Sequence, residues 1–533
     1  MICRFLAAAC LVAVASLSAA GQKPIVVGRP TLVVFVTVDQ MRADYYARFK
    51  PQLTGGLRHL YEGGAFFKNG FQDHAITETA PGHSTTMSGR FPVHTGITSN
   101  ALGVSAADAP LLGGATELGA SPFRFQGTTL TDWMRMADPS MRFLSVSRKD
   151  RGAILPIGKS KGDVYWWSGS AGIFTTSTYY ADTLPPWVQR FNARRGYAAY
   201  AGKSWNLLLP ASEYVEPDSV WEESGGSDFL FPHPFPAELA DVAKGFGNYP
   251  MMDSLTLAFA LQGLKEKQLG ADANRTDLLA ISLSTTDAIG HKYGPDSREI
   301  HDQILRLDRY LGAFLDSLFT LRDQKRIVIA LTGDHGMTPY PEVHSGRYPN
   351  QNAKRVSLAG PVTALNASLA AAGVPEKAWA FDEGVFFVHD AAAFASAKVS
   401  ADSVARAFAA VLRTVPGVMR ADMFTDLARA NPAKDKIARR WLHMFDAGGA
   451  AKMAVTLTPY SYWESTTYAT HGMPHDSDAN VPVVFWGTGV RRGAYADVVR
   501  TVDMAPTLAA ILGIKPTEAL DGVILTKAVR GAK

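Results

Sequence analysis

Short runs of apolar residues recur along the chain and have the pattern of strands that are buried on both faces of a sheet. Residues 31–38 (TLVVFVTV), 277–284 (DLLAISLS), 326–332 (RIVIALT) and 481–487 (VPVVFWG) are continuous and rich in β-branched side chains. A sheet with one face in water would instead alternate apolar and polar residues. These runs therefore predict a central, mostly parallel sheet.

A helical pattern separates the second and third of these runs. Residues 297–321 carry leucine or isoleucine every three or four positions, which predicts a helix with one apolar stripe against the sheet. Its acids Asp302, Asp308 and Asp316 are expected to face solvent. Strands that alternate with helices predict an α/β fold in which helices flank the sheet.

Two segments interrupt this predicted core. Residues 101–250 are rich in Trp, Tyr, Gly, Pro and Ser with few long apolar runs, and we interpret them as an inserted cap. Residues 350–455 form a second insertion with alanine-rich helices. The core is expected from residues 30–100, 250–350 and 455–533, all within one domain of residues 21–533.

The first 20 residues (MICRFLAAACLVAVASLSAA) predict a cleaved signal peptide. Arg4 precedes an apolar run, and Ser18 and Ala20 suit a cleavage site. The run is shorter than the roughly 18–20 residues that span a bilayer, which argues against a membrane anchor. A lipoprotein signal would need Cys10, which lies inside the apolar run. We expect a mature chain that is exported to the periplasm or the exterior and not inserted in a membrane.

Cysteine and charge exclude several classes of site. Cys3 and Cys10 are the only cysteines, so the mature chain would have no disulfide, thiolate zinc site or cysteine nucleophile. Any metal would have to be held by His, Asp and Glu. The chain has 53 Lys and Arg against 49 Asp and Glu, with no basic run, so a nucleic-acid partner is not indicated.

Acids follow three of the predicted strands. Asp39, Asp287 and Asp334 come at or just after the carboxyl ends of the first three apolar runs. Because ligands bind at the carboxyl ends of strands in open α/β sheets, we expect these acids to converge on one site.

Histidines accompany these acids. His291 follows the second acid in a D-x-x-x-H pattern, His335 is adjacent to the third acid, and His471 and His475 form a cluster near the C-terminus. Imidazole and carboxylate together suit zinc. Two ligand sets predict two metal ions. Four other histidines, His74, His83, His94 and His344, are expected to pack or to support the ligands.

A threonine supplies a candidate nucleophile. Thr79 begins the run Thr-Ala-Pro-Gly-His, in which Pro81 fits the first turn of a helix. The hydroxyl of Thr79 would then lie near the helix N-terminus, where anions are favoured. The alternative is that Thr79 only caps the helix.

The order of these residues resembles the alkaline phosphatase superfamily, which includes the type I phosphodiesterases and nucleotide pyrophosphatases. The run that ends in Asn100 (GRFPVHTGITSN) and the segment Ser-Arg-Lys149-Asp-Arg151 are similar to those of exported alkaline phosphatases with a threonine nucleophile. The resemblance extends from about residue 30 to the end. It implies an alkaline-phosphatase-like catalytic domain, a monomer, and hydrolysis of phosphate monoesters through a covalent phospho-threonine.

The resemblance also implies a role for each residue. Asp287, His291 and His471 would hold one zinc ion, and Asp39, Asp334 and His335 would hold another together with the Thr79 oxygen. His471 is preferred to His475 because it precedes a glycine. Asn100, Lys149 and Arg151 would donate hydrogen bonds to the phosphoryl group.

Three alternatives stay open. A phosphodiesterase or nucleotide pyrophosphatase of the same superfamily would share the threonine and the metal ligands, and only the segment with Lys149 and Arg151 separates it. A sulfatase would need a cysteine or serine where Thr79 stands. A periplasmic phosphate-binding or metal-storage protein would keep the ligands without turnover.

Overall fold

The computed structural model of the chain describes residues 28–531. The predicted signal peptide of residues 1–20 lies outside the described residues. Within the described part, no helix is both long and apolar enough to cross a membrane.

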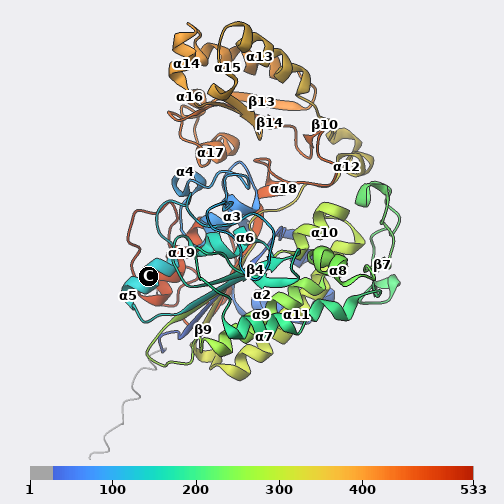
Figure 1. Ribbon diagram of the computed structural model, residues 1–533, viewed down its shortest axis with the longest axis vertical. Coiled ribbons are helices and arrows are strands. Elements are labelled where there is room, and N and C mark those ends of the chain that lie inside the picture. The colour runs from blue at the N-terminus through green and yellow to red at the C-terminus, as the bar shows by residue number, and fades with distance from the viewer. Residues whose placement is uncertain (1–27, 532–533) are drawn as a thin grey trace, which may run out of the picture.

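A nine-stranded, mostly parallel sheet forms the centre of the molecule, as predicted (Figure 1). Its strands, in spatial order, are β17 (Gly493–Arg500), β2 (Ala65–Phe71), β16 (Asn480–Gly487), β9 (Ile327–Thr332), β1 (Leu32–Val38), β8 (Asp277–Leu283), β3 (Phe143–Ser147), β4 (Asp163–Ser168) and β5 (Ile173–Thr175). Strand β1 pairs in parallel with both β8 and β9, whereas β16 runs antiparallel to its neighbours.

Alternate residues of β1 enter two separate hydrophobic cores, one on each face of the sheet. Leu32 and Val34 pack in a core with α2 (Gly56–Gly63), α9 (Met251–Glu266) and α11 (Arg298–Leu321). Val33 and Phe35 pack in a core that includes α5 (Leu130–Ala137) and α19 (Met504–Leu512). Every residue of β1 is buried, which explains its continuous apolar sequence.

Two acids of α11 are buried, contrary to expectation. Asp302 accepts hydrogen bonds from Trp205 Nε1 at 2.7 Å and from the Tyr214 hydroxyl at 2.7 Å. Asp308 accepts from the backbone N–H groups of Thr54, Gly55 and Arg58 at the start of α2. These partners come from distant segments, so helical periodicity gave no sign of them. Asp316 is exposed as expected.

The predicted cap of residues 101–250 also needs correction. Strands β3, β4 and β5 lie within this range and extend the central sheet. The tryptophans of β4 thus belong to a sheet strand, and Trp166 is buried in the core on one face. Most of the rest of the range packs around α9 and α11, through η3 (Gly196–Tyr200), α7 (Pro186–Ala193) and α8 (Leu239–Gly245).

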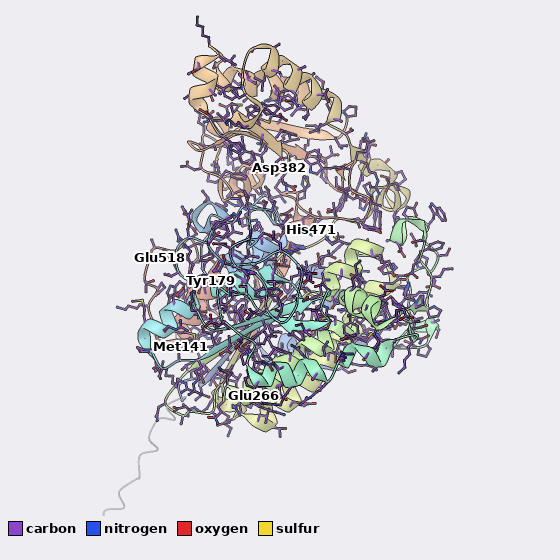
Figure 2. All side chains as sticks on the ribbon, viewed as in Figure 1. Met141, Tyr179, Glu266, Asp382, His471 and Glu518 are labelled. Atoms are coloured by element: carbon purple, nitrogen blue, oxygen red, sulfur yellow. The ribbon has the colours of Figure 1, made fainter. Side chains whose placement is uncertain are left out.

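A smaller lobe above the central sheet comes from the second insertion (Figure 1). Its antiparallel sheet has the order β11 (Trp379–Asp382), β12 (Val385–Val388), β14 (Ala451–Leu457) and β13 (Val418–Met423). Helices α13 (Ala359–Ala371) and α15 (Ala401–Leu412) pack against it. Asp382 lies on the side of this lobe that faces the central part, above His471 (Figure 2).

The lobe is attached next to the segment that precedes Thr79. Arg439 of α17 (Lys436–Leu442) forms an ion pair of 2.8 Å with Asp73, and Ala75 and Ile76 pack in one apolar cluster with residues of the lobe. The lobe therefore contacts the chain where it enters the helix that carries Thr79.

Candidate active site

Three neighbouring parallel strands end at the same edge of the sheet, and an acid follows each of them. Asp39 follows β1, Asp287 lies in the first turn of α10 (Thr285–Tyr293) after β8, and Asp334 follows β9. Because β1 lies between β8 and β9, the three acids meet at the carboxyl edge of the sheet. All three side chains are buried.

Three histidines complete two groups of possible metal ligands. His291 Nε2 is 3.2 Å from Asp287 Oδ1 and 3.2 Å from His471 Nε2. The second group consists of Asp39, Asp287 and His335, and His335 Nε2 is 3.4 Å from Asp39 Oδ1. In each group the ligand atoms lie within 4.8 Å of one another. Asp287 thus stands between the two groups.

Asp334 lies beside the second group. Its Oδ2 is 3.7 Å from His335 Nε2 and 3.0 Å from His83 Nδ1, and its Oδ1 accepts from the backbone N–H of Gln40. The resemblance placed Asp334 among the ligands of this group, and its carboxylate lies beside the ring of His335.

His471, rather than His475, lies beside the acids. His475 Nε2 donates to the carbonyl oxygen of Leu457 at 2.8 Å, and His475 caps the short helix α18 (Asp476–Ala479). This hydrogen bond directs its ring away from Asp287. The glycine that follows His471 was the signal in the sequence that separated the two histidines.

The three histidines share one hydrogen-bonding arrangement. In each ring Nδ1 lies within hydrogen-bond distance of a backbone carbonyl oxygen: His291 with Ala469 at 2.7 Å, His471 with Thr77 at 2.7 Å, and His335 with Gly336 at 2.9 Å. A ring that donates through Nδ1 keeps the lone pair of Nε2 for a cation. All three Nε2 atoms therefore suit metal ligation.

The electrostatics of the site favour added positive charge. Asp39 Oδ1 and His335 Nε2 are buried, and neither has a hydrogen-bond partner among the described residues. Burial alone would lower the pKa of His335, but Asp334 and Asp39 outweigh it and raise this pKa to about 9. Imidazole and carboxylate donors are the ligands of zinc sites that lack cysteine. These residues fit a metal ion.

Thr79 is the first residue of α3 (Thr79–Thr86), and Glu78 occupies the N-cap position. The side chain of Asn100 ties down this end of the helix, because its Oδ1 accepts from the backbone N–H of Ala80 at 2.9 Å. The buried Thr79 hydroxyl accepts from Lys149 Nζ at 3.1 Å. The helix N-terminus and the ammonium both favour negative charge on this oxygen.

The glycine after Pro81 allows α3 to lie directly against the end of β9. A Cβ atom at Gly82 would stand 2.2 Å from the carbonyl oxygen of Asp334. In the next position, His83 Nδ1 is 2.9 Å from the carbonyl oxygen of Thr79, and His83 Nε2 is 2.9 Å from Ser282 Oγ. This close contact sets the position of Thr79 relative to Asp334.

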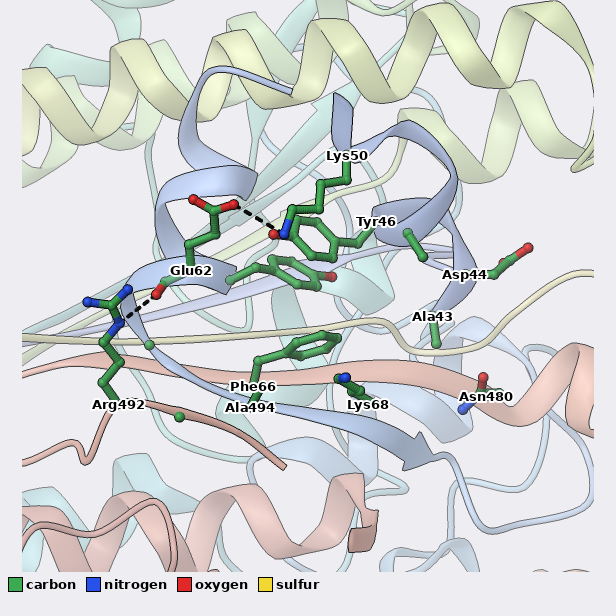
Figure 3. A pocket seen from close by; sticks show the side chains of 14 residues that line it. Ala43, Asp44, Tyr46, Lys50, Glu62, Phe66, Lys68, Asn480, Arg492 and Ala494 are labelled. Atoms are coloured by element: carbon green, nitrogen blue, oxygen red, sulfur yellow. Dashed lines mark hydrogen bonds and ion pairs between the residues drawn. The ribbon is translucent and has the colours of Figure 1, made fainter. Parts of the chain in front are cut away.

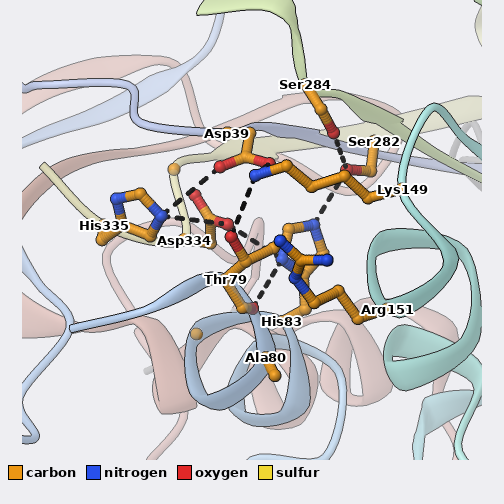
Figure 4. Close-up of polar contacts among 12 residues, drawn as sticks. Asp39, Thr79, Ala80, His83, Lys149, Arg151, Ser282, Ser284, Asp334 and His335 are labelled. Carbon is orange, nitrogen blue, oxygen red and sulfur yellow. Dashed lines mark hydrogen bonds and ion pairs between the residues drawn. The ribbon is translucent and has the colours of Figure 1, made fainter. Parts of the chain in front are cut away.

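Lys149 links the threonine with Asp39 (Figure 4) and also with Asp287. Its Nζ lies 2.7 Å from Asp39 Oδ2 and 2.6 Å from Asp287 Oδ2, in addition to its contact with Thr79. Burial opposes ionisation of Asp287, but Lys149 and His291 hold its pKa well below the ordinary value. The lysine precedes α6 (Asp150–Ile154) and comes shortly after the end of β3.

Arg151 is less constrained than Lys149. Its Nη1 is 3.5 Å from Asp150, and its Nε is buried without a hydrogen-bond partner among residues 28–531. Arg151 and Lys149 both line a cavity of about 640 Å³. The guanidinium is therefore available for an anion that enters beside Thr79.

Gln40 is a site residue that the sequence did not reveal. Its backbone N–H donates to Asp334 Oδ1 at 3.0 Å and its Nε2 donates to Asp287 Oδ1 at 3.1 Å. Its φ is 64°, in the left-handed region that few residues other than glycine adopt. The only available signal was its position directly after Asp39.

Comparison with models of protein families shows to which family the chain belongs. The family model "Type I phosphodiesterase / nucleotide pyrophosphatase" matches residues 33–381. The chain belongs to this family. The match includes the three acids at the strand ends, Thr79 and Lys149.

Within the type I phosphodiesterase and nucleotide pyrophosphatase family, similar relatives are named alkaline phosphatases. Alkaline phosphatase PhoK of Sphingomonas sp is 32% identical over 523 residues, which cover 92% of this chain and 90% of the relative. Alkaline phosphatase PhoV of Synechococcus elongatus is 31% identical, with 94% of each chain covered. The prediction that the chain is an enzyme with this family resemblance is confirmed.

A solved structure supports the fold. The crystal structure of alkaline phosphatase PafA matches with a TM-score of 0.85 and 27% identity, over 94% of this chain and 99% of that one. A PafA sequence from Elizabethkingia meningoseptica is 29% identical over 539 residues. The predicted α/β fold with a mostly parallel central sheet is confirmed.

Proposed function

We propose that this chain is a zinc-dependent alkaline phosphatase that hydrolyses phosphate monoesters through a phospho-threonine at Thr79. The observation that carries the proposal is the position of Lys149, whose ammonium lies within 3.1 Å of the Thr79 hydroxyl. A monoester carries one more anionic oxygen than a diester, so a fixed cation beside the nucleophile favours monoesters.

Two zinc ions fit the groups of histidines and acids at the carboxyl edge of the sheet. Asp287, His291 and His471 would hold one ion, and Asp39, Asp334 and His335 would hold the other. When bound, zinc supplies Lewis acidity, which lowers the pKa of a neighbouring hydroxyl and offsets charge on phosphoryl oxygens. The ring orientations fixed by the Nδ1 hydrogen bonds support this assignment.

Thr79 performs the displacement at phosphorus. The hydroxyl releases its proton to solvent, its oxygen forms a bond to phosphorus while the bond to the leaving oxygen breaks, and the leaving group takes up a proton from solvent. Water then attacks the phospho-threonine, which releases inorganic phosphate and restores the hydroxyl. The first turn of α3 stabilises the negative charge on Thr79 Oγ1 as it attacks phosphorus and again as its bond to phosphorus breaks.

Lys149, Arg151 and Asn100 recognise the phosphoryl group. Arginine can clamp two phosphate oxygens, and lysine adds a point charge. The amide of Asn100 lies next to Thr79, because its Oδ1 is bonded to the N–H of Ala80. The remaining amide N–H groups of Asn100 are then left to donate to substrate.

The test compares an aryl phosphate monoester with the matching diester on zinc-loaded protein. We expect a strong preference in kcat/KM for the monoester. The double variant Lys149→Ala/Arg151→Ala should lose far more activity with the monoester than with the diester. Lys159→Ala, on an exposed residue beyond α6, is the control. Equal losses of kcat/KM with both substrates, or a wild-type preference for the diester, would indicate that the chain is a phosphodiesterase instead.

We also propose export to the periplasm or the exterior as a monomer. Export rests on the predicted signal peptide, and a protein found in the cytoplasmic fraction at full length would contradict it. Size-exclusion chromatography with light scattering tests the monomer.

A further inference from the structure

The cavity beside Lys149 has an excess of positive charge. Arg148, Lys149, Arg151 and Lys244 line its wall, and Glu117 is the only acid among its lining residues. The volume of about 640 Å³ is typical of small-molecule sites and exceeds what one phosphoryl group needs. Two of the four cations, Arg148 and Lys244, have no part in the proposed chemistry.

These two cations lack protein partners. In the part of the chain that the structure describes, neither Arg148 nor Lys244 forms an ion pair or a side-chain hydrogen bond, and Arg148 Nε is buried. Glu117 forms no ion pair with either of them among the described residues, and its Oε2 accepts hydrogen bonds from Ser168 Oγ and Ser170 Oγ, each at 2.7 Å. For Arg148, whose Nε is buried, the lack of a partner costs free energy unless an anion binds.

The backbone holds Arg148 in this position. A Cβ atom at Gly247 would stand 2.6 Å from Arg148 Nη1, so the guanidinium lies directly against the chain there. Gly247 belongs to η6 (Phe246–Asn248), which contacts α10, the helix of Asp287. Burial lowers the pKa of Arg148, although Asp287 and Asp39 act in the opposite direction. Arg148 is thus fixed between the cavity and the site.

A second cavity provides a comparison with the cavity beside Lys149. A groove of about 800 Å³ at the far edge of the sheet is also lined by cations (Figure 3). There Lys50 forms an ion pair of 3.3 Å with Glu62, and Arg492 donates to the carbonyl oxygen of Glu62. Lys50 and Arg492 thus have partners within the protein, whereas the exposed Lys68 of this groove, like Arg148 and Lys244, has none among the described residues.

We propose that the cavity binds a second phosphate group, carried by the leaving group of the substrate. The inference rests on the proposed function and names its substrate class: small molecules with two phosphate groups. The cavity shares Lys149 and Arg151 with the phosphoryl-binding residues, so a phosphoryl group that these two residues bind lies at the wall of the cavity. A guanidinium and an ammonium together match the double charge of a phosphate monoester.

The test compares fructose 1,6-bisphosphate, in which both phosphates are esters of primary hydroxyls, with fructose 6-phosphate, using initial rates of phosphate release. Wild type should have a kcat/KM about 10-fold or more higher for the bisphosphate, since two charge-assisted contacts are gained. Arg148→Met and Lys244→Met should each reduce the ratio of bisphosphate to monophosphate kcat/KM about 5-fold or more, through KM. Lys265→Met, on an exposed residue of α9, should leave the ratio unchanged.

The outcomes separate this inference from the proposed function. A wild-type ratio near two, the value for two equivalent phosphates, refutes the second phosphate site. The second phosphate site is refuted as well if Arg148→Met and Lys244→Met both keep the ratio of bisphosphate to monophosphate kcat/KM that Lys265→Met shows. Lys244 is exposed, so its replacement does not endanger folding and keeps the test valid if Arg148→Met is unstable. A wild type that hydrolyses neither these sugars nor an aryl monoester refutes the proposed function itself.

Discussion

Gly82→Ala tests whether the contact between α3 and β9 sets the catalytic geometry. The added Cβ would stand 2.2 Å from the carbonyl oxygen of Asp334 and 2.8 Å from its Cβ. Ordinary contact begins at about 3.4 Å, so α3 and the end of β9 must separate by roughly 1 Å. The neighbours are the carbonyl group and the Cβ of Asp334, and none of them is the far end of a flexible side chain that could absorb this shift.

The separation moves Thr79 away from Asp334 and His335. A misplacement of about 1 Å can cost roughly 100-fold in rate, so we expect kcat for an aryl phosphate to fall by about this factor. The assay is steady-state hydrolysis at saturating zinc and substrate, with Tm measured by circular dichroism on the same samples. Activity is read well below the Tm of the variant, which separates misplacement from unfolding.

Gly360→Ala provides the matched control. Gly360 lies in α13 of the small lobe, and no atom lies within 4 Å of its added Cβ. Alanine there should leave kcat unchanged and raise stability by up to about 1 kcal/mol, because it favours the helix. A Gly82→Ala protein with a kcat within twofold of wild type would refute the reasoning, since α3 would then tolerate the displacement.

Three further predictions follow from the same structure. Thr79→Ala should bind wild-type amounts of zinc by metal analysis but lose most turnover, and wild-type rates would exclude Thr79 as the nucleophile. His471→Ala should lose about one zinc per chain by the same analysis, whereas His475→Ala should lose none, because only His471 lies beside Asp287. The reverse result would make His475 the metal ligand in place of His471. Burial raises the pKa of Asp253 from 3.8 to about 6, so its contribution to stability falls by about 2 kcal/mol as the pH rises from 4 to 7. Chemical denaturation of Asp253→Asn should show no such fall in its free energy of unfolding. Parallel profiles of this free energy against pH for the variant and wild type would contradict the raised pKa of Asp253.

The sequence revealed those parts of the fold whose signals are local. A run such as TLVVFVTV is buried on both sides, and only a strand within a covered sheet accommodates it. An acid directly after such a run must lie at the carboxyl edge. The convergence of Asp39, Asp287 and Asp334 therefore needed only the assumption that their strands are neighbours, which the order β9, β1, β8 satisfies.

Features that depend on distant partners could not be predicted in this way. Strand β4 has the aromatic composition of a cap, and its place in the sheet depends on its pairing with β3. Asp302 and Asp308 lie on a helix whose pattern assigns them to solvent, but loops from residues 204–214 and 53–58 bring donors to both. Periodicity describes one element at a time, whereas burial of a polar residue is decided by the segment that covers it.

Gln40 shows how the two metal-ligand groups depend on each other. Through its backbone and its side chain it holds Asp334 and Asp287, and its own neighbour is Asp39. A Cβ at Gly290 would lie within the space of the Gln40 amide, so the glycine leaves room for this bridge. The left-handed backbone of Gln40 costs free energy, and the two hydrogen bonds offset it. Because one strained residue orients acids of both groups, a change in either group should alter the other.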